Sequence, residues 1–140
     1  KRQDWKTMAD KESMYNTPPC WPIYICKLVL EWIKNDIGGL EKMEERNVRK
    51  AQLLYDFLDS SCLFKGCAGK ADRSIMNVTF VTGDKDLDAK FVKESTDAGF
   101  VNLKGHRSVG GMRASIYNAM PEEGVAKLVE FMKKFELENK

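Results

Sequence analysis

The sequence predicts an α+β fold in which helices pack on one face of a mostly antiparallel sheet of three to four strands. Apolar residues recur at helical spacing near both ends of the chain, and short strand-like segments bounded by turn residues lie between them. A hairpin-like loop and a helical crossover join these strands, as in a small layered domain. With 140 residues, the chain has the size of one domain.

The N-terminal part combines a polar stretch with a proline-rich approach to the first helix. We expect residues 1–14 to form a linker and residues 15–140 to form the folded domain. Two consecutive prolines favour an extended backbone, and Pro22 suits the first turn of a helix that ends between residues 35 and 39. The apolar residues of this helix form one stripe: Ile25, Leu28, Val29, Trp32 and Ile33.

A second helix is predicted for residues 40–59. One side of it is expected to face the core and carries Leu40, Met43, Asn47, Ala51, Leu54 and Leu58. The other side is charged and carries Glu41, Lys42, Glu44, Glu45, Arg46, Arg49 and Lys50. Opposite charges lie four and five residues apart on that side, which is typical of a solvated helix face.

The middle of the chain alternates between strands and a helix. Residues 63–66 are consistent with a short strand, and the alternating pattern of residues 75–81 predicts a firmer one. Helix-forming residues follow from 85 to 98, and Gly99 stands where a helix C-terminal cap is expected. Residues 100–103 are predicted to be another short strand.

The C-terminal part contains a strand and a long helix. Residues 112–118 are strand-like, with Arg113, Ser115 and Tyr117 expected on one face. The opposite face of this strand carries Met112, Ala114, Ile116 and Asn118. Pro121 begins the last helix, whose apolar stripe consists of Val125, Leu128, Val129, Met132 and Phe135.

The most informative stretch is KGHRSVGGMRASIYNAMP at residues 104–121, which contains the only histidine, two arginines and three glycines. Glycines allow a positive φ or a close approach of the backbone to a ligand. The guanidinium groups of Arg107 and Arg113, together with His106, suit a ligand with two anionic groups, because a guanidinium binds carboxylate or phosphate with two parallel hydrogen bonds. The alternative is a glycine-rich surface turn whose arginines are solvated or paired with glutamates.

Composition narrows the functional classes. The chain is 43% hydrophobic and 31% charged with a net charge of +2, so it lacks the clustered basic excess of nucleic-acid-binding proteins. No apolar run reaches the length of a membrane span and no signal peptide is present, so we expect a cytoplasmic protein without a membrane partner. The spacing of the four cysteines matches neither a redox pair nor a zinc site, and we expect no metal.

Three motifs carry a resemblance to a known family. YNTPP at residues 15–19, DRSIMNVTF at residues 72–80, and KGHRSVGGMRASIYNA followed by a proline and EEGVAKLVEFMKKFE occur in the same order and spacing in the phosphoserine aminotransferases. From about residue 6 to its end, the chain resembles the C-terminal part of this family, which belongs to the class-V, fold-type I aminotransferases. The resemblance implies that residues 15–140 form the small C-terminal domain.

The resemblance also implies an enzyme. The family transfers an amino group between glutamate and 3-phosphohydroxypyruvate, which gives O-phospho-L-serine and 2-oxoglutarate in serine biosynthesis. It uses pyridoxal 5'-phosphate, held mainly by a large domain that precedes this region, and it is homodimeric. No stretch here resembles the motif of the Schiff-base lysine in that domain, so we expect this chain to be an inactive fragment without catalytic residues of its own.

Residue by residue, the resemblance assigns substrate binding to the basic stretch. Arg113 matches the arginine that binds the α-carboxylate of the substrate. His106 and Arg107 match positions that help to hold the phosphate or side-chain carboxylate, although His106 as a turn residue bonded to its own loop is the simpler alternative.

The cofactor-binding assignment concerns the segment before the first helix. Asn16 and Thr17 match the pair that reaches the cofactor phosphate of the neighbouring subunit, and an amide and a hydroxyl are suitable neutral donors. The alternative is a restrained turn, since Thr17 precedes Pro18. A rival function from another class also stays open: a non-enzymatic α+β module that binds an anionic ligand or a protein partner.

Overall fold

A computed structural model describes residues 4–139, which belong to two compact units, Lys1–Leu40 and Glu41–Lys140. The two units are described separately below. No helix among residues 4–139 combines the length and the apolar character needed to cross a bilayer.

The first unit is helical. It begins with α1 (Trp5–Asp10), which the sequence analysis did not predict because residues 1–14 were expected to be a linker. The helix is short and forms where Asp4 caps it, accepting hydrogen bonds from the backbone N–H of Lys6 and, at 2.7 Å, from the hydroxyl of Thr7. Such a cap satisfies a backbone N–H group at the start of the helix that has no partner within the helix.

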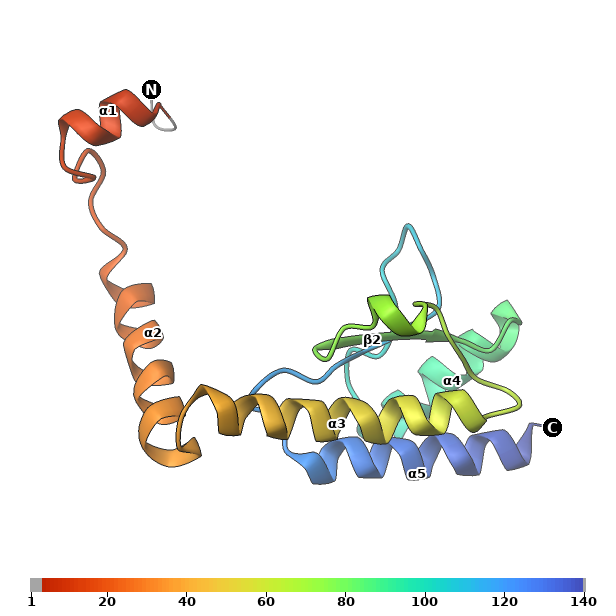
Figure 1. Ribbon diagram of the computed structural model, residues 1–140. Helices are drawn as coiled ribbons and strands as arrows, with labels where there is room; N and C mark the ends of the chain where they lie inside the picture. The colour runs from red at the N-terminus through yellow and green to blue at the C-terminus, as the bar shows by residue number, and fades with distance from the viewer. Residues whose placement is uncertain (1–3, 140) are drawn as a thin grey trace. The chain divides into compact units, whose positions relative to one another are not determined.

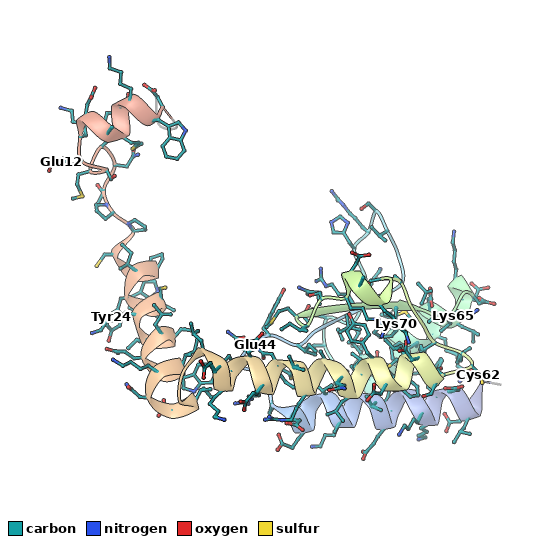
Figure 2. The ribbon with its side chains drawn as sticks, viewed as in Figure 1. Glu12, Tyr24, Glu44, Cys62, Lys65 and Lys70 are labelled. Carbon is teal, nitrogen blue, oxygen red and sulfur yellow. The ribbon has the colours of Figure 1, made fainter. Side chains whose placement is uncertain are left out.

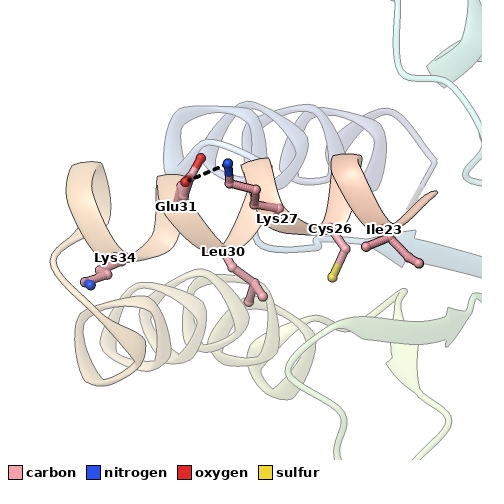
Figure 3. Close-up of a pocket in the computed structure, with 6 residues that line it drawn as sticks. All are labelled: Ile23, Cys26, Lys27, Leu30, Glu31 and Lys34. Carbon is pink, nitrogen blue, oxygen red and sulfur yellow. Dashed lines mark ion pairs between the residues drawn. The ribbon is translucent and has the colours of Figure 1, made fainter. Parts of the chain in front are cut away.

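The main helix of the first unit is α2 (Cys20–Trp32), which continues without a break as a π-helix, η1 (Ile33–Ile37). Gly38, at a φ of 94°, ends it within the predicted range. The residues of α2 are not buried, and Leu28 and Val29 keep 40% and 45% of their surface exposed. Ile23, Cys26 and Leu30 line a shallow groove of about 420 Å³ on this helix (Figure 3).

The second unit contains a three-stranded antiparallel sheet in the order β1-β2-β3, which confirms the predicted sheet type. The strands are β1 (Lys65–Gly66), β2 (Asn77–Val81) and β3 (Met112–Ser115). The register pairs Lys65 with Val81 and Thr79 with Arg113. Antiparallel strands need only local connections or one helical crossover, as the spacing of the strand-like segments implied.

The strand predicted for residues 100–103 is wrong. This segment contacts β3 through one isolated bridge, between Lys104 and Met112, and through a hydrogen bond of 2.7 Å from Arg113 N to Leu103 O. Asn102 has a φ of 62°, and this left-handed residue interrupts the extended backbone that a strand requires. β3 is therefore an edge strand that is paired on its outer side only near its start.

Three helices pack with the sheet: α3 (Leu40–Ser60), α4 (Lys85–Asp97) and α5 (Glu122–Glu138). A single 3-10 turn, η2 (Lys70–Asp72), lies between β1 and β2. α3 and α5 run side by side in the same direction (Figure 1): Arg49, in the middle of α3, pairs with Glu122 at the start of α5, and Ser61, just after α3, bonds Glu136 near the end of α5. Charged side chains such as Glu44 remain exposed on α3 (Figure 2).

The core is an aromatic cluster centred on Phe91 of α4, which is completely buried. Its ring centroid lies 5.1 Å from that of Phe64 and 5.2 Å from that of Phe135, both with nearly perpendicular planes. Edge-to-face packing of this kind is the preferred geometry of aromatic rings. Val78 and Phe80 reach the same cluster from the buried face of β2, so the alternation of β2 and β3 ties the sheet to the helices.

The prediction that the whole charged side of α3 is solvated is wrong at Lys50. Its side chain is completely buried, and its ammonium donates to the carbonyl oxygens of Ile116 (3.1 Å), Tyr117 (2.8 Å) and Met120 (3.1 Å). Burial is the main cause that lowers the pKa of Lys50, and the nearby charge of Arg46 lowers it further. All three donors of the ammonium are used, so Lys50 fixes the chain that leaves β3 against α3.

A second fixed point joins the segment before β2 to α3. Arg73 donates through both terminal nitrogens to the carboxylate of Asp59, one contact measuring 2.9 Å. Its guanidinium also lies 4.4 Å from the centroid of the Tyr55 ring. These contacts give Arg73 a structural role, because they tie the segment before β2 to α3.

We predict that Lys50→Met lowers the free energy of unfolding by roughly 3 kcal/mol or more, because buried carbonyls lose their donor. The measurement is urea denaturation of the variant and the wild type. Lys42→Met is the control, since Lys42 forms only an exposed pair with Glu45 and should change stability by less than about 1 kcal/mol. Equal stability of the Lys50 variant and the wild type would contradict the role of Lys50.

The pair between Asp59 and Arg73 predicts a pH dependence. Hydrogen bonds from Arg73 lower the pKa of Asp59 from its ordinary value of 3.8 to about 2. A carboxyl group with a lowered pKa contributes stability above its unfolded pKa and loses it as the pH falls through the folded value. Urea midpoints should therefore fall between about pH 4 and pH 2 in the wild type and vary less in Asp59→Asn; a constant offset between the two proteins across that range would refute the pairing.

Candidate functional site

The basic loop consists of residues 105–111 and projects from the sheet, away from α3 and α5 (light blue, Figure 1). Its base is closed by a hydrogen bond of 2.8 Å from Gly105 N to Gly111 O. The carbonyl of His106 accepts hydrogen bonds from Val109 N at 2.9 Å and Gly110 N at 2.8 Å. These backbone bonds give the loop a defined shape and leave its side chains directed outward.

Two of the glycines at the base of the loop are required by close packing. A Cβ atom on Gly105 would lie 2.2 Å from the carbonyl oxygen of Gly110, which is impossible without moving the backbone. Gly111 has a φ of 63°, and its Cβ would lie 2.6 Å from Cγ1 of Val81 and 3.0 Å from the carbonyl oxygen of Phe80. Because Gly111 has no side chain, the end of the loop can pass directly beside β2.

The side chains of His106 and Arg107 are exposed on the loop. His106 Nδ1 lies 2.7 Å from the hydroxyl of Ser108 and 3.3 Å from its backbone N–H, which is the loop-internal bonding that the sequence left open. Arg107 forms no ion pair within residues 4–139. The alternative in which the arginines pair with glutamates is therefore not found in this part of the protein.

Arg113 lies on β3 on the face opposite the aromatic core, as the alternation predicted. Met112 and Ala114 are buried, while Arg113 is half-buried and stands across from Thr79 of β2. Its Nε is buried and has no hydrogen-bond partner among residues 4–139, and its guanidinium forms no ion pair there. Arg73 Nε is also buried without a partner, but the guanidinium of Arg73 is paired with Asp59. The absence of a carboxylate partner is what leaves the charge of Arg113 available to a ligand or another segment.

The sheet face around Arg113 is polar, as the predicted alternation implied, but sequence reasoning missed the hydrogen bonds to Asn77 on it. The side-chain oxygen of Asn77 accepts hydrogen bonds from the hydroxyls of Ser115 (3.0 Å) and Tyr117 (3.3 Å). These groups come from strands 38 and 40 residues apart in sequence, so only the register of β2 and β3 could have revealed the network.

The electrostatic character of the site follows from the sequence of the segment. Residues 98–121 contain Lys104, Arg107 and Arg113 but no aspartate or glutamate. The bridge between Lys104 and Met112 places the start of the loop beside β3, so all these cations lie at one end of the sheet. Such an arrangement attracts anions, because no carboxylate of the same segment neutralises it.

Asn16 and Thr17 belong to the first unit, whereas His106, Arg107 and Arg113 belong to the second. Asn16 and Thr17 lie between α1 and α2, and both are exposed. Neither side chain donates or accepts a hydrogen bond within residues 4–139. Their amide and hydroxyl groups are therefore available to a ligand, although the alternative of a restrained turn also describes this geometry.

The glycine geometry generates a prediction with a matched control. Gly111→Ala should lower the free energy of unfolding by about 2–3 kcal/mol, because both the positive φ and the close contact with β2 oppose a side chain. Gly110→Ala should cost only about 1 kcal/mol, since Gly110 has a φ of 81° but open space around it. Equal effects of the two substitutions in urea denaturation would show that the close approach to Val81 is absent.

Comparison with known proteins places this geometry in a family. The profile described as Aminotransferase class-V matches residues 2–128. The phosphoserine aminotransferase of Streptococcus thermophilus is 57% identical over 138 residues, which is 98% of this chain and 38% of the relative.

Solved structures agree with the sequence comparison. The phosphoserine aminotransferase from Bacillus circulans subsp. alkalophilus has a TM-score of 0.90 and 47% identity, covering 97% of this chain and 38% of its own. The pyridoxal-phosphate-bound enzyme from Trichomonas vaginalis has a TM-score of 0.83 and 41% identity, covering 93% and 37%. The chain thus spans less than two fifths of the length of these relatives, and the fold agrees with the small domain of a fold-type I aminotransferase. This chain belongs to the class-V aminotransferase family.

Proposed function

We propose that this chain is part of a longer phosphoserine aminotransferase, which transfers an amino group between glutamate and 3-phosphohydroxypyruvate. The observation that carries the proposal is the half-buried Arg113, whose guanidinium forms no ion pair among residues 4–139, beside a loop without acidic residues. The products of the proposed enzyme are O-phospho-L-serine and 2-oxoglutarate. The similarity to phosphoserine aminotransferases over 98% of the chain supports this enzyme over a non-enzymatic anion-binding module.

Arg113 binds the α-carboxylate of the substrate in this proposal. Both amino-acid substrates carry that group, so one guanidinium serves both half-reactions. A planar guanidinium on a strand forms two parallel hydrogen bonds and so fixes the rotation of the amino acid about Cα. Orientation of the Cα–H bond is the main requirement for proton removal at that atom.

His106 and Arg107 bind the distal anionic group. One site must accept the phosphate of phosphoserine and the smaller, less charged carboxylate of glutamate. Donors on an exposed loop with a defined backbone can satisfy both groups by small side-chain rotations, which a site on two rigid strands could not do. The loop side chains of this chain are exposed and free of ion pairs, which supports that role.

The proposed cofactor is pyridoxal 5'-phosphate, held mainly by residues outside this chain. When bound, it supplies the electron sink that makes proton loss at Cα possible. Asn16 and Thr17 fit its phosphate as neutral donors, because their side chains are exposed and unbonded among the described residues. No lysine here matches the Schiff-base motif, so the lysine is assigned to the remainder of the longer protein, which is proposed to be a cytoplasmic homodimer.

We predict that Arg113→Ala in the longer protein lowers kcat/KM roughly tenfold to a hundredfold for both glutamate and O-phosphoserine. The reason is the loss of a charge-assisted bidentate contact of about 1.5–3 kcal/mol. Steady-state kinetics with each substrate provide the measurement. Arg49→Ala is the control, since Arg49 forms an exposed pair with Glu122 and should leave kcat/KM unchanged. An effect on only one substrate would exclude a role at the shared α-carboxylate.

A further inference from the structure

We propose that Ser108 is a positioning residue, which holds His106 in the tautomer with its proton on Nε2. The exposed Nε2–H is then the donor that this loop offers to an anionic ligand. The ligand role rests on the proposed function, whereas the tautomer follows from hydrogen-bond geometry within the loop.

The backbone N–H of Ser108 determines whether Nδ1 of His106 carries a proton. This group can only donate, and it points at His106 Nδ1 from 3.3 Å. A ring nitrogen that accepts a hydrogen bond uses its lone pair, so it carries no proton. In neutral imidazole the single proton must then lie on Nε2.

The hydroxyl of Ser108 reinforces this assignment. It lies 2.7 Å from Nδ1 and can either donate or accept. If Nδ1 carried the proton, the hydroxyl could accept it, but the backbone N–H would then face another N–H and lose its acceptor. If Nδ1 is unprotonated, both groups of Ser108 donate to it, and no donor faces another donor.

The loop backbone keeps these groups together. Because Val109 N and Gly110 N both donate to the carbonyl of His106, residues 106–110 form a closed turn with Ser108 inside it. The ring of His106 is consequently anchored through Nδ1, while His106 and the adjacent Arg107 are both exposed residues. An Nε2–H donates to phosphate or carboxylate oxygen, whereas an unprotonated Nε2 would repel the same oxygen.

The tautomer can be observed directly by long-range proton–nitrogen NMR of the ¹⁵N-labelled chain, since His106 is its only histidine. The spectrum should be recorded near pH 8, above the ordinary histidine pKa of about 6.5. We expect a pyridine-type signal for Nδ1 and a pyrrole-type signal for Nε2. The reverse assignment would overturn the inference.

Variants separate Ser108 from the rest of the loop. Ser108→Ala removes the hydroxyl and should give a mixture of tautomers, whereas Ser108→Thr retains the hydroxyl and should give the wild-type spectrum. Val109→Ala is the control, because the side chain of Val109 is 85% exposed and is aliphatic, so it cannot form a hydrogen bond with the ring. A wild-type spectrum for Ser108→Ala would refute the role of the hydroxyl.

Kinetics of the longer protein test the consequence for binding. Ser108→Ala should raise the KM for O-phosphoserine roughly twofold to tenfold with little change in kcat, the effect of weakening one hydrogen bond, and Ser108→Thr should not. An Nδ1–H spectrum in an active enzyme would overturn this inference alone. The expected spectrum in a protein without transaminase activity would instead refute the proposed function and leave the tautomer assignment intact.

Discussion

The two-residue alternation of β3 is the constraint on which the rest of the site depends. Met112 and Ala114 are buried against the helices, so the intervening Arg113 must point to the other face of the sheet. Lys50 holds the chain directly after this strand by donating to three carbonyls. Register and anchoring together present a charged side chain on a rigid element, at the small cost of one buried donor without a partner.

Two arginines of this chain differ in whether their charge is neutralised by contacts within the fold. Arg73 is neutralised by Asp59 and stacked on Tyr55, so its charge is used within the fold. Arg113 has no carboxylate partner among residues 4–139, and the segment around it contains no acidic residue at all. Both occur in family-like motifs, and only their contacts distinguish a structural ion pair from a group that remains available to an anionic substrate.

Periodicity was sufficient to predict α3, α5 and the two faces of β3, and residue type predicted α4 and its C-terminal cap at Gly99. Periodicity failed where the structure depends on a contact between residues far apart in sequence, or on a single residue. Lys50 lies among charged residues of α3, and the carbonyls that it binds are 66 to 70 residues away. The strand expected at residues 100–103 is prevented by one left-handed residue, Asn102, and α1 depends on a single cap. The sequence therefore indicated individual residues of the candidate site, but not the hydrogen bonds that Ser115 and Tyr117 form with Asn77.

We propose that this fold leaves the guanidinium of Arg113 unpaired and so available to a substrate carboxylate. A crystal structure of the longer protein with O-phosphoserine or glutamate bound tests it most directly. We expect two roughly parallel contacts of about 2.7–2.9 Å between the α-carboxylate and Arg113. A protein carboxylate paired with Arg113 in that complex, with the substrate bound elsewhere, would contradict it.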